Sequence, residues 1–303
     1  MPQQMPAVSL VAVPGRRRAT IEVAKEIERR GFAGIYSPSP FGNMALCEAL
    51  ALSTERIPFG TSIAPIYART VEDFAQSAAF IHEMSGGRFR FGIGVSHGPS
   101  HIRMGVKPGK PLSDTRAFVE KYRAHENLGG LPPITLATLR VKMIELSGEI
   151  GQGLVFANGS RSHMAASLKA LSPAKRSDPN FFIGDMIPTC VSDDIEAAKA
   201  VNRKTLTSYA LLPNYRAYWK EAGYVEEMEA IEKAVAENRR EDVPKCLTDK
   251  WLADCTLFGP AKRIRDELDA WYASGIKTPI IVPTSAAGNQ MKAIEEMFAT
   301  FSG

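Results

Sequence analysis

Apolar residues follow two alternating patterns along the chain. Short runs rich in Val, Ile, Leu and Phe are typical of buried strands, and longer segments with apolar residues three or four positions apart are typical of helices. The first pair illustrates both, because the run 7–13 ends at Pro14-Gly15 and the helical pattern over 20–30 ends before Gly31. Strands are predicted at 7–13, 33–36, 57–63, 88–95, 134–137, 153–157, 181–191 and 278–282.

A helix is predicted after each of these strands. Eight strands that are each followed by a helix match the count of a (β/α)₈ barrel, and such strands run parallel because each helix returns the chain to the same edge. We therefore predict an α/β fold of the TIM-barrel type. A doubly wound open sheet is the alternative and would need fewer strands. The predicted helices cover 20–30, 44–53, 71–84, 113–127, 140–149, 162–171, 194–209 and 289–301.

The connection between the seventh and eighth predicted strands is longer than one crossover helix. The segment 213–238 has the pattern of one or two helices, and 260–274 has the pattern of another. We therefore predict an extra helical insertion between strands 7 and 8 and no second domain. On this interpretation, residues 1–303 form a single barrel domain.

Composition and charge narrow the classes of protein that fit. The 303 residues are 45% hydrophobic and 23% charged, and a chain of this length and composition can bury a large apolar core. The net charge of +4 comes without the concentrated basic stripe of a nucleic-acid-binding protein. The one dense basic run, Arg16-Arg17-Arg18, precedes a predicted helix and indicates either a solvated helix start or a phosphate contact.

Several familiar signals are missing from the sequence. Its apolar runs are too short to span a bilayer, and its first residues lack the pattern of a signal peptide. The four cysteines form no CxxC pair and no cluster with the five histidines, so we expect reduced cysteines and no metal site. Nucleophile, zinc-protease and Walker motifs are also missing. We expect a cytoplasmic protein with no membrane or nucleic-acid partner.

In a TIM barrel, chemistry belongs at the C-terminal ends of the strands, where the loops converge. Gly92 and Gly94 lie near the end of the predicted strand 88–95, and Ser96 follows it. These small residues allow a flat ring to approach the strand end. His97 follows at once, and its charge changes near neutral pH, which suits a group that gives and takes a proton. The competing interpretation is ordinary turn chemistry, with His97 bonded to the loop backbone.

A second candidate site follows the predicted strand 153–157. Asn158, Gly159 and Ser160 open a helix, and Arg161 comes next. Free N–H groups at a helix N-terminus, a hydroxyl and a cation together suit a phosphate. Asn, Gly and Ser are also common capping residues, so both interpretations stand.

Two further groups of residues favour structural roles. Glu145 and Glu149 lie four apart on a helix predicted outside the barrel, where they form a solvated face. The aromatic residues of the predicted insertion suit packing of the added helices, and shaping a substrate entrance is the alternative. These aromatic residues are Tyr215, Tyr218, Trp219 and Tyr224.

Two long stretches resemble a known family. One is MSGGRFRFGIG at 84–94, and the other runs from PPITLA at 132–137 through VKMIELSGEIGQG at 141–153, with LFGP at 257–260 also matching. In this order they resemble the luciferase-like family of flavin and deazaflavin oxidoreductases. The resemblance implies a TIM-like barrel that binds FMN or the 8-hydroxy-5-deazaflavin coenzyme F420 at the strand ends. It also implies a small-molecule substrate and a homodimer.

The resemblance assigns roles to particular residues. Ser62-Ile63 fall where family members hold a non-proline cis peptide behind the ring. Glycine and small residues after the fourth strand would line the ring, and those after the fifth and sixth strands would approach the phosphate end. Together with Asn158, the candidate cofactor residues are Ser62, Ile63, Gly94, Val95, Ser96, Ala137, Thr138, Gly159 and Ser160.

The sequence also departs from the family pattern. Ser37-Pro38-Ser39-Pro40 offers no histidine after the second strand, Gln152 replaces the usual Asp, and His97 stands where several dehydrogenases carry a glutamate. We therefore interpret His97 as the acid/base candidate and disfavour a sugar-phosphate dehydrogenase. A short loop after the fourth strand favours F420 with hydride transfer. An FMN-dependent monooxygenase with a separate flavin reductase, or a non-catalytic flavin-binding barrel, is the alternative.

Overall fold

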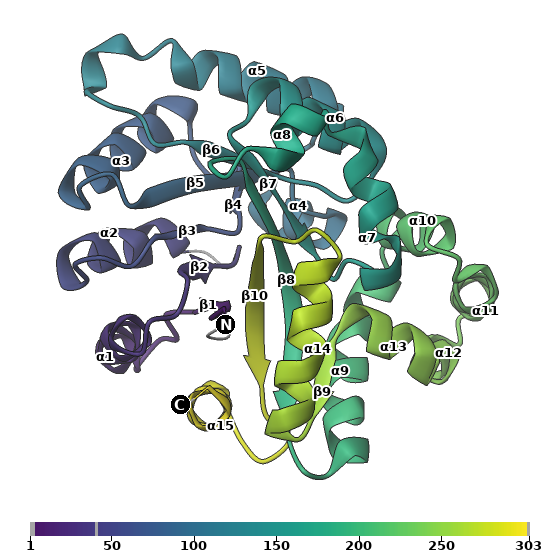
Figure 1. The fold of residues 1–303 in the computed structure, drawn as a ribbon. Coiled ribbons are helices and arrows are strands. Elements are labelled where there is room, and N and C mark those ends of the chain that lie inside the picture. Colours follow the sequence, from purple (N-terminus) through teal and green to yellow (C-terminus); the bar gives the residue numbers. More distant parts are fainter. Residues whose placement is uncertain (1–3, 40–41, 302–303) are drawn as a thin grey trace. The chain divides into compact units, whose positions relative to one another are not determined.

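The computed structural model describes residues 4–39 and 42–301. Pro40, the last residue of the loop predicted after the second strand, lies outside the described residues. Close contacts divide the chain into two compact units, whose elements are labelled in Figure 1. The single domain expected for the whole chain stays a prediction. Unit 1 consists of Met1–Val155 and Ala170–Gly184, and unit 2 of Phe156–Lys169 and Asp185–Gly303.

Unit 1 contains the first strands, which run parallel. They pair in the order β1-β2-β3-β5-β6-β7, and β4 pairs with the C-terminal end of β5. Parallel strands joined by helices end at one common edge, so the loops that follow them gather there. The strands are β1 (Ala7–Ser9), β2 (Ile35–Ser37), β3 (Phe59–Thr61), β4 (Ala64–Pro65), β5 (Phe89–Gly94), β6 (Ile134–Ala137) and the start of β7 (Gly153–Ala157).

Polar side chains fix where several helices of unit 1 begin or end. The Thr70 hydroxyl caps α3 by accepting the Asp73 N–H at 3.2 Å. The Arg88 guanidinium, from the SGGR stretch, donates to the carbonyl oxygens of Ala51 and Thr54 at the end of α2. The helices are α1 (Arg17–Arg29), α2 (Asn43–Ser53), α3 (Val71–Met84), α4 (Gly98–Met104), α5 (Pro111–Arg123), the 3₁₀ turn Glu126–Leu128, α6 (Val141–Ile150) and α8 (Pro173–Ser177).

Aromatic rings fill much of the core of unit 1. The ring of Phe91 on β5 lies 5.5 Å from Phe74 on α3 and 5.4 Å from Tyr122 on α5, between ring centroids. All three rings are buried. Burying each such ring contributes about 1.5–3 kcal/mol, so these contacts hold α3 and α5 against β5.

Unit 2 contains the end of β7, most of β8 and the rest of the chain. β8 pairs in parallel with β9 and also pairs with β10. Trp219 and Trp251 are fully buried and pack edge to face, with centroids 4.8 Å apart. The elements are α7 (Arg161–Ser167), the 3₁₀ turn Leu168–Ala170, β8 (Phe182–Val191), α9 (Ile195–Ala210), α10 (Pro213–Glu221), α11 (Val225–Ala236), the 3₁₀ turn Arg240–Asp242, α12 (Val243–Cys246), α13 (Asp249–Cys255), β9 (Leu257–Gly259), α14 (Ala261–Ala273), β10 (Thr278–Thr284) and α15 (Gln290–Thr300).

The element order confirms the predicted α/β class and the TIM-barrel type. All eight predicted strands are present, and a helix follows each of them along the chain. The segment 213–238 forms α10 and α11, which lie apart from β8, β9 and β10 in Figure 1. The segment 260–274 forms α14, as predicted. The sequence patterns missed several short elements, among them β4, β9, α4, α8, α12 and α13.

The prediction of a short loop after the fourth strand was wrong. Sixteen residues separate Gly94 from Pro111, and they include α4. Pro99 stands in the first turn of this helix, and Gly105 ends it with a left-handed φ of 67°. Pro in the first turn and Gly just past the end are typical of helix boundaries, although both residues also mark loops. The argument from a compact barrel mouth to F420 therefore does not hold.

Two features are absent from the residues that the structure describes. Across 4–39 and 42–301, no helix has both the length and the apolar character needed to cross a membrane. In the same ranges, no group of three His, Cys, Asp or Glu side chains is placed to hold a metal ion. Disulfides do not join the cysteines, which are Cys47, Cys190, Cys246 and Cys255.

Candidate functional site

Three residues meet where β4, β5 and β6 of unit 1 end. The peptide bond between Ser62 and Ile63 is cis, which confirms the feature implied by the resemblance. β4 begins just after it and brings Pro65 beside Gly94. A Cβ atom on Gly94 would lie 2.8 Å from the Ala137 Cβ and 3.1 Å from the Ile63 Cδ1. Only glycine fits there, so Ile63, Gly94 and Ala137 form one closely packed surface.

Two buried hydroxyls border this surface. The Ser62 Oγ and the Thr138 Oγ1 have no hydrogen-bond partner among the described residues. A buried hydroxyl left without a partner costs about 1–3 kcal/mol. These hydroxyls therefore keep a hydrogen-bonding capacity that no described residue uses. We refer to Ser62, Ile63, Gly94, Ala137 and Thr138 as the strand-end cluster.

Asn43 supports the strand-end cluster, and the sequence patterns missed it. Its side-chain amide, on the first turn of α2, donates to the Ile63 carbonyl at 3.1 Å and to the Pro38 carbonyl at 3.3 Å. The Ser62 N–H donates to the Ser37 carbonyl at 2.6 Å. These bonds fix the backbone on both sides of the cis peptide. An Asn at a helix start beside a predicted strand end was the available signal.

The segment after β5 carries His97. Ser96 has a left-handed φ of 64°, and His97 returns to extended backbone before α4 begins. His97 is half-buried, and burial lowers the pKa of its imidazole below the ordinary value of 6.5, with His101 adding to the effect. The His97 imidazole is therefore neutral at pH 7 and able to accept a proton.

A second group holds the loop that contains α4. The His101 Nε2 lies 2.5 Å from the Val95 carbonyl oxygen, and its ring stands edge-on to Tyr67 with centroids 5.6 Å apart. The Tyr67 hydroxyl donates to the Asp114 Oδ2 at 2.5 Å, and the Gly109 N–H donates to the same oxygen at 2.8 Å. Burial, together with Asp114, raises the pKa of Tyr67. The sequence patterns missed Tyr67 and Asp114, because their partners are far away along the chain.

In unit 2, the predicted phosphate-binding turn is buried. Asn158, Gly159 and Ser160 are each almost inaccessible, and Asn158 has a left-handed φ of 58°. The Ser160 N–H donates to the Tyr218 hydroxyl at 2.9 Å, and the Asn158 carbonyl accepts the Trp219 Nε1–H at 3.3 Å. Side chains of α10 thus hold this turn, and they confirm the packing role expected of the aromatic residues in the insertion.

Two acidic residues flank the same turn. The Gly159 N–H donates to the Asp185 Oδ1 at 3.4 Å, and the exposed Ser162 donates its N–H and hydroxyl to the Asp254 carboxylate at 2.9 and 2.7 Å. Asp185 is fully buried, and burial raises the pKa of its carboxyl well above the usual 3.8. In contrast to these engaged donors, one nitrogen of the Arg161 guanidinium is buried without a partner among the described residues. We refer to residues 158–160 as the buried turn.

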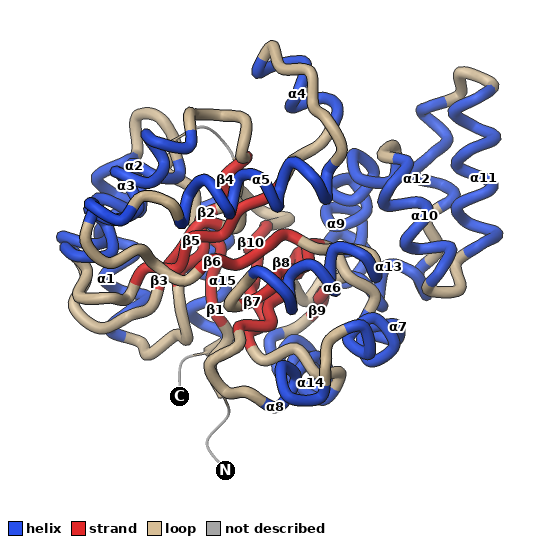
Figure 2. Tube along the Cα trace, turned by 90° about the horizontal axis from the view of Figure 1, so that it is seen from above, coloured by secondary structure: helices blue, strands red, loops and turns tan. Residues whose placement is uncertain are grey.

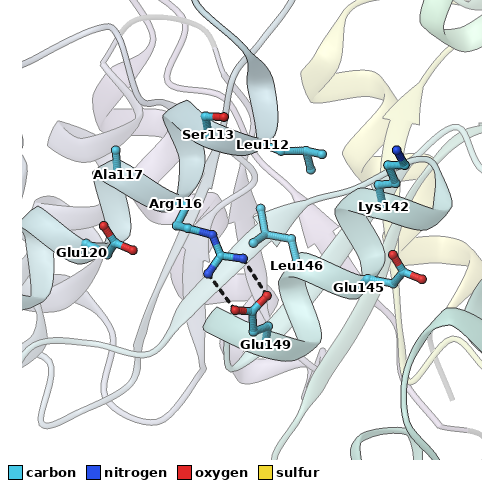
Figure 3. A pocket seen from close by; sticks show the side chains of 9 residues that line it. All are labelled: Leu112, Ser113, Arg116, Ala117, Glu120, Lys142, Glu145, Leu146 and Glu149. Atoms are coloured by element: carbon cyan, nitrogen blue, oxygen red, sulfur yellow. Dashed lines mark hydrogen bonds and ion pairs between the residues drawn. The ribbon is translucent and has the colours of Figure 1, made fainter.

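An open groove of unit 1 lies elsewhere, on the helices α5 and α6. It has a volume of about 430 Å³, and Figure 3 shows its lining. The Arg116 guanidinium forms two bonds with the Glu149 carboxylate, at 2.7 and 2.6 Å, and Glu145 is exposed. This confirms the solvated face predicted for the two glutamates. An exposed ion pair contributes little energy and offers no group suited to redox chemistry.

Comparison with known proteins identifies the family. The family model described as luciferase-like monooxygenase matches residues 4–127 and 121–278. The chain therefore belongs to the luciferase-like family of oxidoreductases. A Mycobacterium tuberculosis protein, provisionally named a coenzyme F420-dependent oxidoreductase, is 24% identical to this chain over 315 residues, which cover 88% of this chain and 90% of that protein.

Solved structures show the same fold. The coenzyme F420-dependent tetrahydromethanopterin reductase of Methanopyrus kandleri has a TM-score of 0.73 at 15% identity and covers 97% of both chains. The oxygenating constituent of 3,6-diketocamphane monooxygenase of Pseudomonas putida, solved in complex with FMN, has a TM-score of 0.63 at 13% identity and covers 92% of both chains. These likenesses support the TIM-barrel assignment over nearly the whole chain.

Proposed function

We propose that this protein is an oxidoreductase that binds the deazaflavin coenzyme F420 and exchanges a hydride with a small organic substrate. The observation that carries the proposal is the strand-end cluster, where a glycine that admits no side chain and two unpaired hydroxyls meet at the end of parallel strands. In a TIM barrel, this end is where ligands bind. The family membership and the named F420-dependent relative support the choice of coenzyme.

The residues of the strand-end cluster fit a flat ring with polar edges. Ile63, Gly94 and Ala137 supply an apolar surface, and the hydroxyls of Ser62 and Thr138 have no partner among the described residues. We therefore propose that Ala137 and Thr138, which the resemblance assigned to the phosphate end, contact the ring instead. We propose that Val95 and Ser96 line the same ring from the adjoining loop. A bound deazaflavin supplies two-electron hydride chemistry, and the protein supplies orientation and exclusion of water.

For the phosphate end of the cofactor, the earlier hypothesis involves Asn158, Gly159 and Ser160. The N–H groups of Gly159 and Ser160 already bond side chains of unit 2, whereas Arg161 retains an unpaired nitrogen. We therefore propose that Arg161 makes the main charged contact to the phosphate, and that the buried turn holds its backbone in place. A guanidinium pairs well with phosphate oxygens.

We propose that His97 moves the proton that accompanies hydride transfer. When the substrate is an alcohol, its carbon loses the hydride and its hydroxyl proton passes to the neutral imidazole, and the reverse reaction returns both. The lowered pKa keeps His97 in the accepting form at neutral pH.

Titration of the purified protein with F420 and with FMN, followed by absorption and fluorescence, tests the proposal. We expect saturable binding of one F420 per chain, at least about tenfold tighter than FMN, a difference of about 1.4 kcal/mol. Tighter binding of FMN would favour the monooxygenase that works with a separate reductase. Binding of neither compound would favour a non-catalytic barrel and overturn the proposal.

We also propose that two copies of the chain pair through α2 and α3. These helices pack against each other, and their outer faces expose Leu52 by 65%, Phe80 by 51% and Met84 by 45%. Apolar side chains gathered in this way mark protein contacts. Phe80→Glu should convert a dimer to a monomer in light scattering, while Val225→Glu on α11 should not. A monomeric parent protein would contradict this proposal.

A further inference from the structure

We propose that His101 is a positioning residue that fastens the α4 loop onto the strand end and thereby sets the place of His97. The proposal rests on the proposed function in one respect, because it gives His97 the proton-transfer role. Figure 2 shows α4 standing apart from the strands β3, β5 and β6 of unit 1. None of its side chains is buried, and Ile102 is 83% exposed. Apolar burial therefore does little to hold this helix.

Specific polar contacts hold it instead. A carbonyl oxygen only accepts hydrogen bonds, so the His101 Nε2 carries the hydrogen in its contact with Val95. This bond closes a ring of backbone from Val95 through His97 to His101, within which the His101 N–H also donates to the His97 carbonyl at 3.0 Å. The imidazole thus ties the residue before the left-handed Ser96 to the helix that follows His97.

The far end of the loop that contains α4 is also held in place. The His101 ring stands at 83° to the Tyr67 ring, and Tyr67 bonds Asp114 on α5. Asp114 in turn holds the Gly109 N–H beyond α4. The loop is therefore anchored at Val95 and at Gly109, and His101 lies between the two anchors. The titratable groups that interact with His101 include Tyr67 and His97, and Asp114 bonds Tyr67 behind it.

This arrangement predicts a specific effect of losing the bond to Val95. His97 is half-buried and has no rigid element of its own, because it lies between the end of β5 and the start of α4. If α4 is released, the His97 imidazole becomes more hydrated, and its pKa rises toward its ordinary value. A displacement of about 1 Å at a reacting group costs up to about 100-fold in rate.

Two substitutions at His101 separate the effect of its hydrogen bond to Val95 from the effect of the size of its ring. His101→Phe keeps an aromatic edge against Tyr67 and removes the donor, whereas His101→Gln keeps an N–H that can reach the Val95 carbonyl. Ile102→Ala, at the exposed position on the same helix, is the matched control. Amide hydrogen exchange over 95–106 and the NMR titration of the His97 ring report the outcome, and neither needs cofactor or substrate.

We expect His101→Phe to speed exchange in this segment at least tenfold and to raise the pKa of His97. We expect His101→Gln to keep exchange within about threefold of the parent and Ile102→Ala to leave both readings unchanged. Parent-like readings in His101→Phe would overturn the proposal, as would equal effects of the two substitutions at His101. A protein that gives the expected readings but binds neither F420 nor FMN would retain the positioning role and lose the proposed function.

Discussion

The strand-end cluster of unit 1 and the buried turn of unit 2 look alike in sequence but differ in structure. Both place glycine and hydroxyl residues directly after a parallel strand, which is a common setting for ligand binding. In the strand-end cluster, the hydroxyls of Ser62 and Thr138 lack partners. In the buried turn, the N–H of Ser160 already bonds Tyr218. The fold therefore engages the backbone donors of Gly159 and Ser160 in the buried turn, whereas it leaves the hydroxyls of the strand-end cluster unpaired.

The largest expected effect is on the chemistry beside the strand-end cluster. His97→Ala should lower turnover by roughly 10²–10⁴-fold, the usual size of an acid–base contribution, and leave F420 affinity within about twofold. Steady-state kinetics with a substrate found by screening, together with cofactor titration, would measure both. Turnover at the parent rate would show that His97 only caps the loop. In that case a loss of about 1 kcal/mol in stability would be the remaining effect.

A smaller effect should follow from filling the surface of the strand-end cluster. The added methyl group in Gly94→Ala would press on Ala137 and Ile63, so we expect roughly tenfold weaker cofactor binding and a stability cost of about 1–3 kcal/mol. Gly98→Ala is the matched control, because a Cβ there meets nothing within 4 Å. Equal affinities in the two variants would place the ring elsewhere.

The sequence predicted the fold better than the site. Hydrophobic period and turn residues located eight of the ten strands of the described residues, because these strands are largely buried and most are bounded by Gly, Pro or Ser. They missed β9, whose three residues Leu257–Gly259 are too few to show a period. They also misjudged α4, since Pro99 and Gly105 mark both loops and helix ends.

The site was harder to predict because its contacts join distant parts of the chain. The bond from Asn43 to Ile63 spans 20 residues, and that from Tyr67 to Asp114 spans 47. No local pattern records such pairs. Resemblance to the family did locate the cis peptide at Ser62-Ile63, because a motif carries information that periodicity does not. The burial of Ser160 could not be foreseen, since its partner Tyr218 belongs to the inserted helices.

The buried turn should respond in stability and not in affinity. Tyr218→Phe removes the acceptor of the Ser160 N–H, and leaving that group unpaired should lower the free energy of unfolding by about 1–3 kcal/mol. Cofactor affinity per folded molecule should stay within about twofold. Ser162→Ala, at an exposed neighbour that bonds Asp254, should cost less than about 1 kcal/mol. A tenfold loss of affinity without loss of stability would show instead that the turn itself contacts the phosphate.

The last expected effect is a pH dependence of stability, and it concerns Asp185, which bonds the buried turn from β8. Its folded pKa lies well above the usual 3.8, so the protonated carboxyl favours folding below that value, and this stability is lost as pH rises toward the folded pKa. Asp185→Asn keeps the acceptor for the Gly159 N–H but cannot ionise. Between about pH 5 and pH 7, the stability of the parent relative to this variant should fall by up to about 1.4 kcal/mol per pH unit. Thermal unfolding at a series of pH values measures the difference. If the difference in stability between the parent and this variant does not change with pH, the folded carboxyl does not titrate differently from the unfolded one in this range. Ligand or solvent would then reach the buried turn.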